Sequence, residues 1–162
     1  MDRNELQERF KSGERDFSGV DLTSEDLTRI NLSGADLSNA KMEGVYIAEA
    51  NLRGTNFRNA SFAEAIFNGA DLTGADLRES DLRWATFGTA NLTDADLRGA
   101  RFDETGFSRI NLTGANLRGV KLRDCRLHGT NLTYACLDKA DLSRASLCDT
   151  IMPDGIIRND RC

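Results

Sequence analysis

A five-residue repeat dominates this sequence. From Phe17 to Met152 every fifth residue is Leu, Phe, Met or Ile, without a break. From Val20 to Thr150, the place two before each of them holds a small residue at nearly every unit, most often Ala, and Glu25 is the only charged residue there. A period of five matches neither the 3.6 residues of an α-helical turn nor the alternation of a β-strand. The repeat therefore excludes an ordinary helix or strand over this part of the chain.

The other three places of each unit predict a corner. The place before the large apolar residue is usually Asp or Asn, the place after it is mostly Ser, Thr or Arg, and the next is often Gly. Glycine there permits the positive φ of a type II turn. Four units would close a square coil of about 20 residues, stacked on the next at the strand spacing of about 4.8 Å. One large and one small inward side chain per unit can fill such a narrow tube.

Composition and the first residues agree with a thin solenoid. The 162 residues are 40% hydrophobic but only 7% aromatic, which suits a core one column wide. Asp2 has the position of an N-cap with Glu5 three residues later, and Leu6 and Phe10 share one helical face. We expect a short helix over residues 3–11. A solenoid needs its ends covered, so this helix is expected to cap the first coil.

The repeated unit resembles that of a known family. The pattern A-[D/N]-L-x-x, as in Ala35-Asp-Leu-Ser-Asn and Ala95-Asp-Leu-Arg-Gly, is similar to the pentapeptide-repeat family, and small cyanobacterial members in particular. This resemblance implies an all-β fold, a right-handed quadrilateral β-helix (solenoid), here of about seven coils. The expected division is a capping helix at 1–14, the β-helix at 15–152 and a tail at 153–162.

One face of the predicted solenoid departs from the usual polar surface. Residues 20 apart would stack, so Tyr46, Ile66 and Thr86 share a column where Asp or Asn normally stands. Trp84 lies at the corner leading into this face. Exposed apolar patches often mark partner sites, so we predict a protein-binding surface of Tyr46, Ile66, Trp84 and Thr86. The alternative is local packing of Trp84 over Ile66 and Thr86.

Another face carries a row of arginines, predicted as a secondary basic surface. It could hold an acidic partner, or it could be a lattice of surface salt bridges, each worth less than about 1 kcal/mol. The row consists of Arg58, Arg78, Arg98 and Arg118.

A third face stacks Asn and Thr side chains, and its simplest interpretation is a structural role. The fourth face carries charges of both signs.

The sequence offers no support for catalysis. His128 is the only histidine, and no phosphate-binding loop, metal-ligand spacing or nucleophile elbow is present. We therefore expect no enzyme activity, no cofactor and no metal. The four cysteines, Cys125, Cys136, Cys148 and Cys162, form no C-x-x-C pair. Free thiols are expected in a reducing compartment. Any disulfide should join Cys162 to Cys136 or Cys148.

Charge and hydropathy limit the partners. The net charge of −5 argues against direct nucleic-acid binding. No apolar run is long enough to span a membrane, and the N-terminus lacks the apolar core of a signal peptide, which predicts a cytoplasmic protein. We expect a non-enzymatic interaction module with a protein partner, as a monomer or weak homo-oligomer. The resemblance also allows a DNA mimic that binds DNA gyrase, the quinolone-resistance class, and a purely structural protein remains a third reading.

Overall fold

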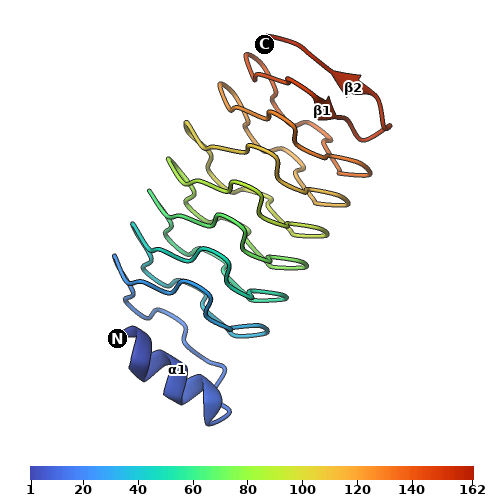
Figure 1. The fold of residues 1–162 in the computed structure, drawn as a ribbon. Helices are drawn as coiled ribbons and strands as arrows, with labels where there is room; N and C mark the ends of the chain where they lie inside the picture. The colour runs from blue at the N-terminus through green and yellow to red at the C-terminus, as the bar shows by residue number, and fades with distance from the viewer.

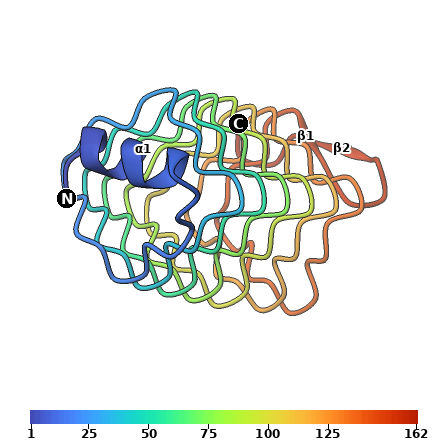
Figure 2. The same cartoon turned by 90° about the horizontal axis from the view of Figure 1, so that it is seen from below.

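The computed structural model describes residues 1–162 as a stack of four-cornered coils (Figure 1). One helix, α1 (Arg3–Lys11), lies across the first coil, and two short strands, β1 (Thr150–Ile151) and β2 (Ile157–Arg158), form an antiparallel pair at the other end. Seen along the stack, the coils follow one another in nearly the same outline (Figure 2). The β-solenoid expected from the repeat is therefore the fold that is found.

Each coil contains 20 residues, as the repeat predicts. In almost every unit, the residue before the large apolar residue forms a parallel bridge with the residue 20 places later, from Asp16 with Asp36 to Asn131 with Ile151. The exception is Arg101, which forms no bridge with Lys121. The Leu22 amide donates to the Lys41 carbonyl at 2.8 Å, and the Lys41 amide donates to the Val20 carbonyl at 2.9 Å. Backbone polar groups are thus satisfied by the coils above and below.

The corners have the expected turn geometry. The last place of every unit from residue 19 to residue 149 has a positive φ, for example +67° at Gly74 and +59° at Trp84. The turn is closed by a hydrogen bond such as that from the Ala75 amide to the Leu72 carbonyl, 2.9 Å. Many of these residues are not glycine. Stacking against two neighbouring coils holds them in a conformation that their local preference disfavours.

The core runs along the inside of the tube. The large and small apolar residues of the repeat are buried over most of the stack, as at Leu97 and Ala95, both 0% exposed, whereas Leu137, Ala140 and Leu142 in the last coils are half-buried. Hydroxyls at some of the small places are also buried, and they donate to carbonyls of the core, as Thr105 does to Leu82 at 2.8 Å. No buried side-chain nitrogen or oxygen lacks a partner. The inward assignment of the repeat is therefore confirmed.

The helix occupies the range predicted for it. Asp2 accepts a hydrogen bond from the Glu5 amide at 2.9 Å, as an N-cap does, and Leu6 is fully buried. Arg3 donates to the carbonyls of Asp26 and Thr28 on the first coil. These contacts hold α1 on the end of the stack. With nine residues, α1 is too short and too polar to cross a bilayer.

The tail folds back over the last coil. β2 pairs with β1 in the register Thr150–Arg158 and Ile151–Ile157. Cys148 and Cys162 form a disulfide, while Cys125 and Cys136 are free. The expectation of four free thiols is thus wrong for this pair, and one of the two pairings predicted for Cys162 is the one found. The pairing of β2 with β1 brings the end of the chain back to Cys148.

Candidate partner surface

The predicted partner surface lies on one flat face of the solenoid. Consecutive parallel bridges join Tyr46 to Ile66, Ile66 to Thr86 and Thr86 to Gly106, so the four form a single column. We call this column, Tyr46, Ile66, Thr86 and Gly106, the uncharged strip. Neighbours along it are separated by the strand spacing of about 4.8 Å. The structure therefore brings together three residues that the sequence analysis assigned to one site.

The surface exposes aromatic area to solvent. Tyr46 is 52% and Trp84 is 47% exposed, Thr86 is exposed, and Ile66 is half-buried. The guanidinium of Arg83 lies 5.0 Å from the centre of the Trp84 ring, and Arg83 is itself paired with Asp81 at 2.6 Å. These contacts position Trp84 from the neighbouring face. The indole is therefore a supported, solvent-accessible side chain at the corner that leads into the face of the uncharged strip.

A shallow groove of about 490 Å³ lies on the same face, nearer the C-terminal end, and sequence reasoning did not anticipate it. Gly88 occupies the place after the large apolar residue, where Ser, Thr or Arg is usual, so one wall lacks a side chain. This glycine is the feature of the sequence from which the groove could have been predicted. His128 Nε2 lies 2.6 Å from Ser146 Oγ, beside the disulfide. The groove is lined by Gly88, Thr89, Ser108, Arg109, His128, Gly129, Cys148 and Asp149.

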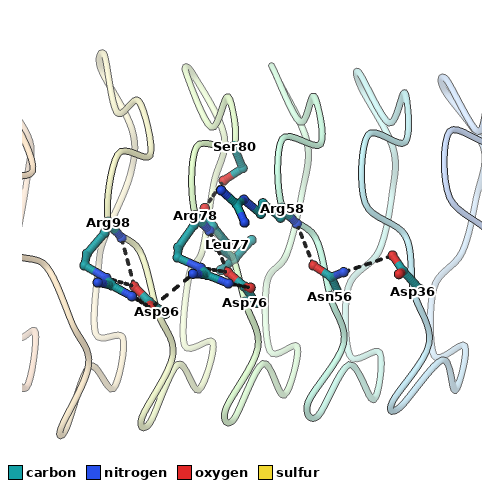
Figure 3. Close-up of polar contacts among 9 residues, drawn as sticks. All are labelled: Asp36, Asn56, Arg58, Asp76, Leu77, Arg78, Ser80, Asp96 and Arg98. Carbon is teal, nitrogen blue, oxygen red and sulfur yellow. Dashed lines mark hydrogen bonds and ion pairs between the residues drawn. The ribbon is translucent and has the colours of Figure 1, made fainter.

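The arginine row is largely paired with carboxylates (Figure 3). Arg78 contacts Asp76 at 2.5 Å and Asp96 at 3.8 Å, while Arg98 contacts Asp96 at 2.6 Å. Hydrogen bonding by Arg78 holds the pKa of Asp76 below its ordinary value. These pairs favour a lattice of surface salt bridges over a row of unpaired arginines that holds an acidic partner.

Arg58 and Arg118 lie at the two ends of this row and differ from each other. Arg118 pairs with Asp138, 20 residues later, at 2.9 Å. Arg58 forms no ion pair, and its backbone amide donates to Asn56, whose side chain in turn donates to Asp36 at 3.0 Å (Figure 3). Arg58 is therefore the one member of the row whose guanidinium is free to meet an acidic partner.

The Asn and Thr face is a hydrogen-bonded ladder. Thr93 Oγ1 donates to Asn91 Oδ1 at 2.7 Å and accepts from Asn111 Nδ2 at 3.0 Å, which links successive coils. The same arrangement recurs where Asn91 donates to Thr73. Because these groups satisfy each other, they support the structural reading of this face.

Comparison with known families identifies the repeat. The model described as "Pentapeptide repeats" matches in eight copies, covering residues 16–54, 40–79, 80–119, 90–129 and 110–149. The chain belongs to the pentapeptide-repeat family. The resemblance inferred from the repeated A-[D/N]-L-x-x unit is thereby confirmed. No curated protein is significantly similar to the chain in sequence.

Solved structures of this family share the fold. Trypsin-treated QnrB1, a plasmid-mediated fluoroquinolone resistance protein, is 24% identical, with a TM-score of 0.70 over 85% of this chain and 67% of that chain. HetL from the cyanobacterium Nostoc sp. strain PCC 7120, a pentapeptide-repeat protein involved in heterocyst differentiation regulation, is 25% identical over 98% of this chain and 100% of its own, with a TM-score of 0.47. The fold class is that of the family, a right-handed β-helix.

Proposed function

We propose that this pentapeptide-repeat protein is a non-enzymatic module that binds another protein through Tyr46, Ile66, Trp84 and Thr86. The observation that carries the proposal is the exposure of Tyr46 in the uncharged strip and of Trp84 at the corner before it, in a chain with 29% charged residues. Aromatic residues are frequent energetic anchors of protein interfaces. On such a strip, water can be excluded without desolvating a charge.

The rigidity of the scaffold supports the same proposal. The strip is held by backbone hydrogen bonds on both sides, for example from the Ile66 amide to Val45 and from the Phe67 amide to Thr86, both within 2.9 Å. A preorganised surface loses little conformational entropy when it binds. Arg58, unpaired on another face, would then contribute long-range attraction to an acidic partner rather than contact area.

The test restores the ordinary surface of the repeat. In the double variant Ile66→Asn with Trp84→Gly, both residues become types common at their places, so the fold should persist. We expect capture of a partner from a lysate of the source organism to be lost, with the far-UV circular dichroism spectrum unchanged. Arg78→Glu serves as the comparison on another face. Capture that persists in the double variant but disappears in Arg78→Glu would assign the binding site to the arginine row.

A second candidate function follows from the fold shared with QnrB1, a fluoroquinolone resistance protein. A DNA mimic needs a one-signed acidic surface, whereas here arginines neutralise carboxylates on several faces, as Arg83 does for Asp81. This observation favours the interaction module over a gyrase-binding DNA mimic. A supercoiling assay with purified DNA gyrase distinguishes the two, because a DNA mimic should inhibit supercoiling or protect it from a quinolone. A protein that shows neither gyrase effects nor partner capture would have a purely structural role.

The proposed function comes with a proposed domain division and a proposed cellular location. The rod would have about seven coils, with residues 1–14 as the cap, 15–152 as the β-helix and 153–162 as the tail. Binding would need no cofactor, metal, membrane or nucleic acid. We place the protein in the cytoplasm, where thiols are kept reduced. Alkylation of intact cells before lysis tests this, because reduced Cys148 and Cys162 are expected there.

A further inference from the structure

We propose that the partner surface binds a second copy of this chain, face to face, with the two rods antiparallel. The inference rests on the proposed function, since it names the partner of that same surface. The two-fold axis would lie in the interface, perpendicular to the rods, at the level between Phe67 and Phe87. Such an axis reverses the order of the coils in the second copy, so that the two rods run in opposite directions. Each outward column of one copy then lies opposite the same column of the other copy. Every pairing across the interface can therefore be derived from the observed columns.

Charge at the two ends of the uncharged strip carries the argument. The bridges extend the column to Asp26 below Tyr46 and to Arg126 above Gly106, at equal distances from the axis. The rotation places each Asp26 opposite Arg126 of the other copy, twice in the dimer. Arg126 is exposed and forms no ion pair within its own chain. The Asp26 side chain is 70% exposed, and its one ion pair is a 3.9 Å contact with Arg3. Asp26 Oδ1 also accepts a hydrogen bond from the Thr28 amide at 2.9 Å.

The corner that follows this face repeats the relationship. Glu49 and Arg109 both hold the last place of a unit at this corner, on coils at equal distances from the axis. Each Glu49 would therefore meet Arg109 of the other copy. Glu49 is bonded to Arg29 in its own chain at 2.7 Å, while Arg109 forms no ion pair. No like charges face each other on these columns. A parallel arrangement would instead bring each charged end against the same end of the other copy.

Side-chain size is complementary about the same axis. Tyr46 would lie opposite Gly106 of the second copy, and Ile66 opposite Thr86. In the neighbouring outward column, Asn68 would lie opposite Gly88. A Cβ built on Gly106 would approach only the Thr86 methyl group, at 3.9 Å, so the space above this glycine is open. The largest side chain of the strip therefore faces the place with no side chain.

The area available predicts a weak and reversible dimer. Six coils from Asp26 to Arg126 span about 24 Å at the strand spacing. A single narrow face of that height buries less than the roughly 1,600 Å² of a standard interface. Exposed ion pairs at its edges also make association weaker as the salt concentration rises. The dimer should therefore be sought at high protein concentration and low ionic strength.

The test is a charge exchange followed by sedimentation equilibrium over a wide concentration range. The parent should show a reversible monomer–dimer equilibrium. Asp26→Arg alone and Arg126→Asp alone should each raise the dissociation constant by about tenfold or more, because like charges then meet at both ends. The double variant should restore dimerisation, since the two charges exchange places across the axis.

Two further variants separate contact from charge. Gly106→Gln should leave the melting temperature unchanged, because the added side chain meets open space, but it should abolish the dimer by colliding with Tyr46 of the other copy. The matched control is Asp21→Lys with Lys121→Asp, an equal exchange at the same separation on a neighbouring face, which should not change the dissociation constant.

The outcomes separate this inference from the proposed function. A parent that stays monomeric at the highest concentration, or a dimer unaffected by Asp26→Arg, overturns the antiparallel dimer. If lysate capture still depends on Ile66 and Trp84 in that case, the proposed function stands with a different partner. If neither dimerisation nor capture responds to Ile66→Asn with Trp84→Gly, the proposed function fails as well.

Discussion

Phe67 and Phe87 stack with parallel rings, their centroids 4.7 Å apart and their planes within 1° of each other. This separation equals the spacing of about 4.8 Å between neighbouring strands, so the coil repeat sets the distance between the rings. Phe107 continues the column at 5.8 Å from Phe87. The stack lies directly beneath the uncharged strip. A flat, stiff face above stacked aromatic rings is the structural basis of both proposals.

The narrow core should tolerate neither a larger nor a smaller side chain. Ala95 and Leu97 are both fully buried in one unit. Ala95→Leu should lower the free energy of unfolding by about 1–3 kcal/mol through overpacking. Leu97→Ala should lower it by about 2–5 kcal/mol by leaving a cavity. Chemical denaturation followed by circular dichroism measures both, and parental midpoints in the two variants would contradict the inward assignment.

The corner glycines should differ from the glycines outside the corners. Gly74 has φ of +67°, and a Cβ there would meet nothing, so Gly74→Ala isolates the backbone cost, about 1–2 kcal/mol. Gly106 does not have a positive φ, and its Cβ would make only an ordinary contact with Thr86. Gly106→Ala is therefore the matched control and should melt like the parent. Equal melting temperatures for both variants would mean that the corner does not require a positive φ.

The thiols should differ sharply in reactivity. Burial raises the pKa of Cys125 to about 12, so its reactive thiolate is scarce near neutral pH. Cys136 is exposed and free, and Cys148 is bonded to Cys162. For the purified protein with this disulfide formed, we expect native alkylation to label Cys136 rapidly, Cys125 only after unfolding, and Cys148 and Cys162 only after reduction. Mass spectrometry of the labelled peptides measures this, and a bridge through Cys125 would contradict the register.

Acid should weaken the last coils through Asp141. Hydrogen bonds from Ser143, followed by that from Arg123, lower the pKa of Asp141 from 3.8 to about 2. Because the folded value lies below the unfolded one, the carboxylate stabilises the fold above about pH 4, and this contribution is lost as the pH falls towards 2. In Asp141→Asn the group cannot titrate. The melting temperature of the variant should therefore fall less than that of the parent between pH 5 and pH 2. Identical pH profiles of the melting temperature would contradict a stabilising role of the Asp141 carboxylate.

Much of the fold was predictable from the sequence because one local rule repeats along the chain. The place of Leu97 in its unit indicated burial, and the helix signals around Asp2 indicated residues 3–11. The place of Tyr46, Ile66 and Thr86 in one column followed from the period of 20. The groove at Gly88 was missed, because a single absent side chain leaves the repeat intact. The neutralisation of the arginine row was left open, because ion pairing depends on side-chain rotamers.

The sequence by itself determined the coil, its register and which residues point inward, since a period of five with two apolar places is compatible with few other arrangements. Tertiary structure alone decided which surface groups satisfy each other. Arg78 folds back onto Asp76 while Arg58 stays unpaired, although both hold the same place in the repeat. Likewise the disulfide joins Cys148, not Cys136, to Cys162. Each of these outcomes depends on distances between side chains on different coils or on the returning tail, which a one-dimensional repeat does not specify.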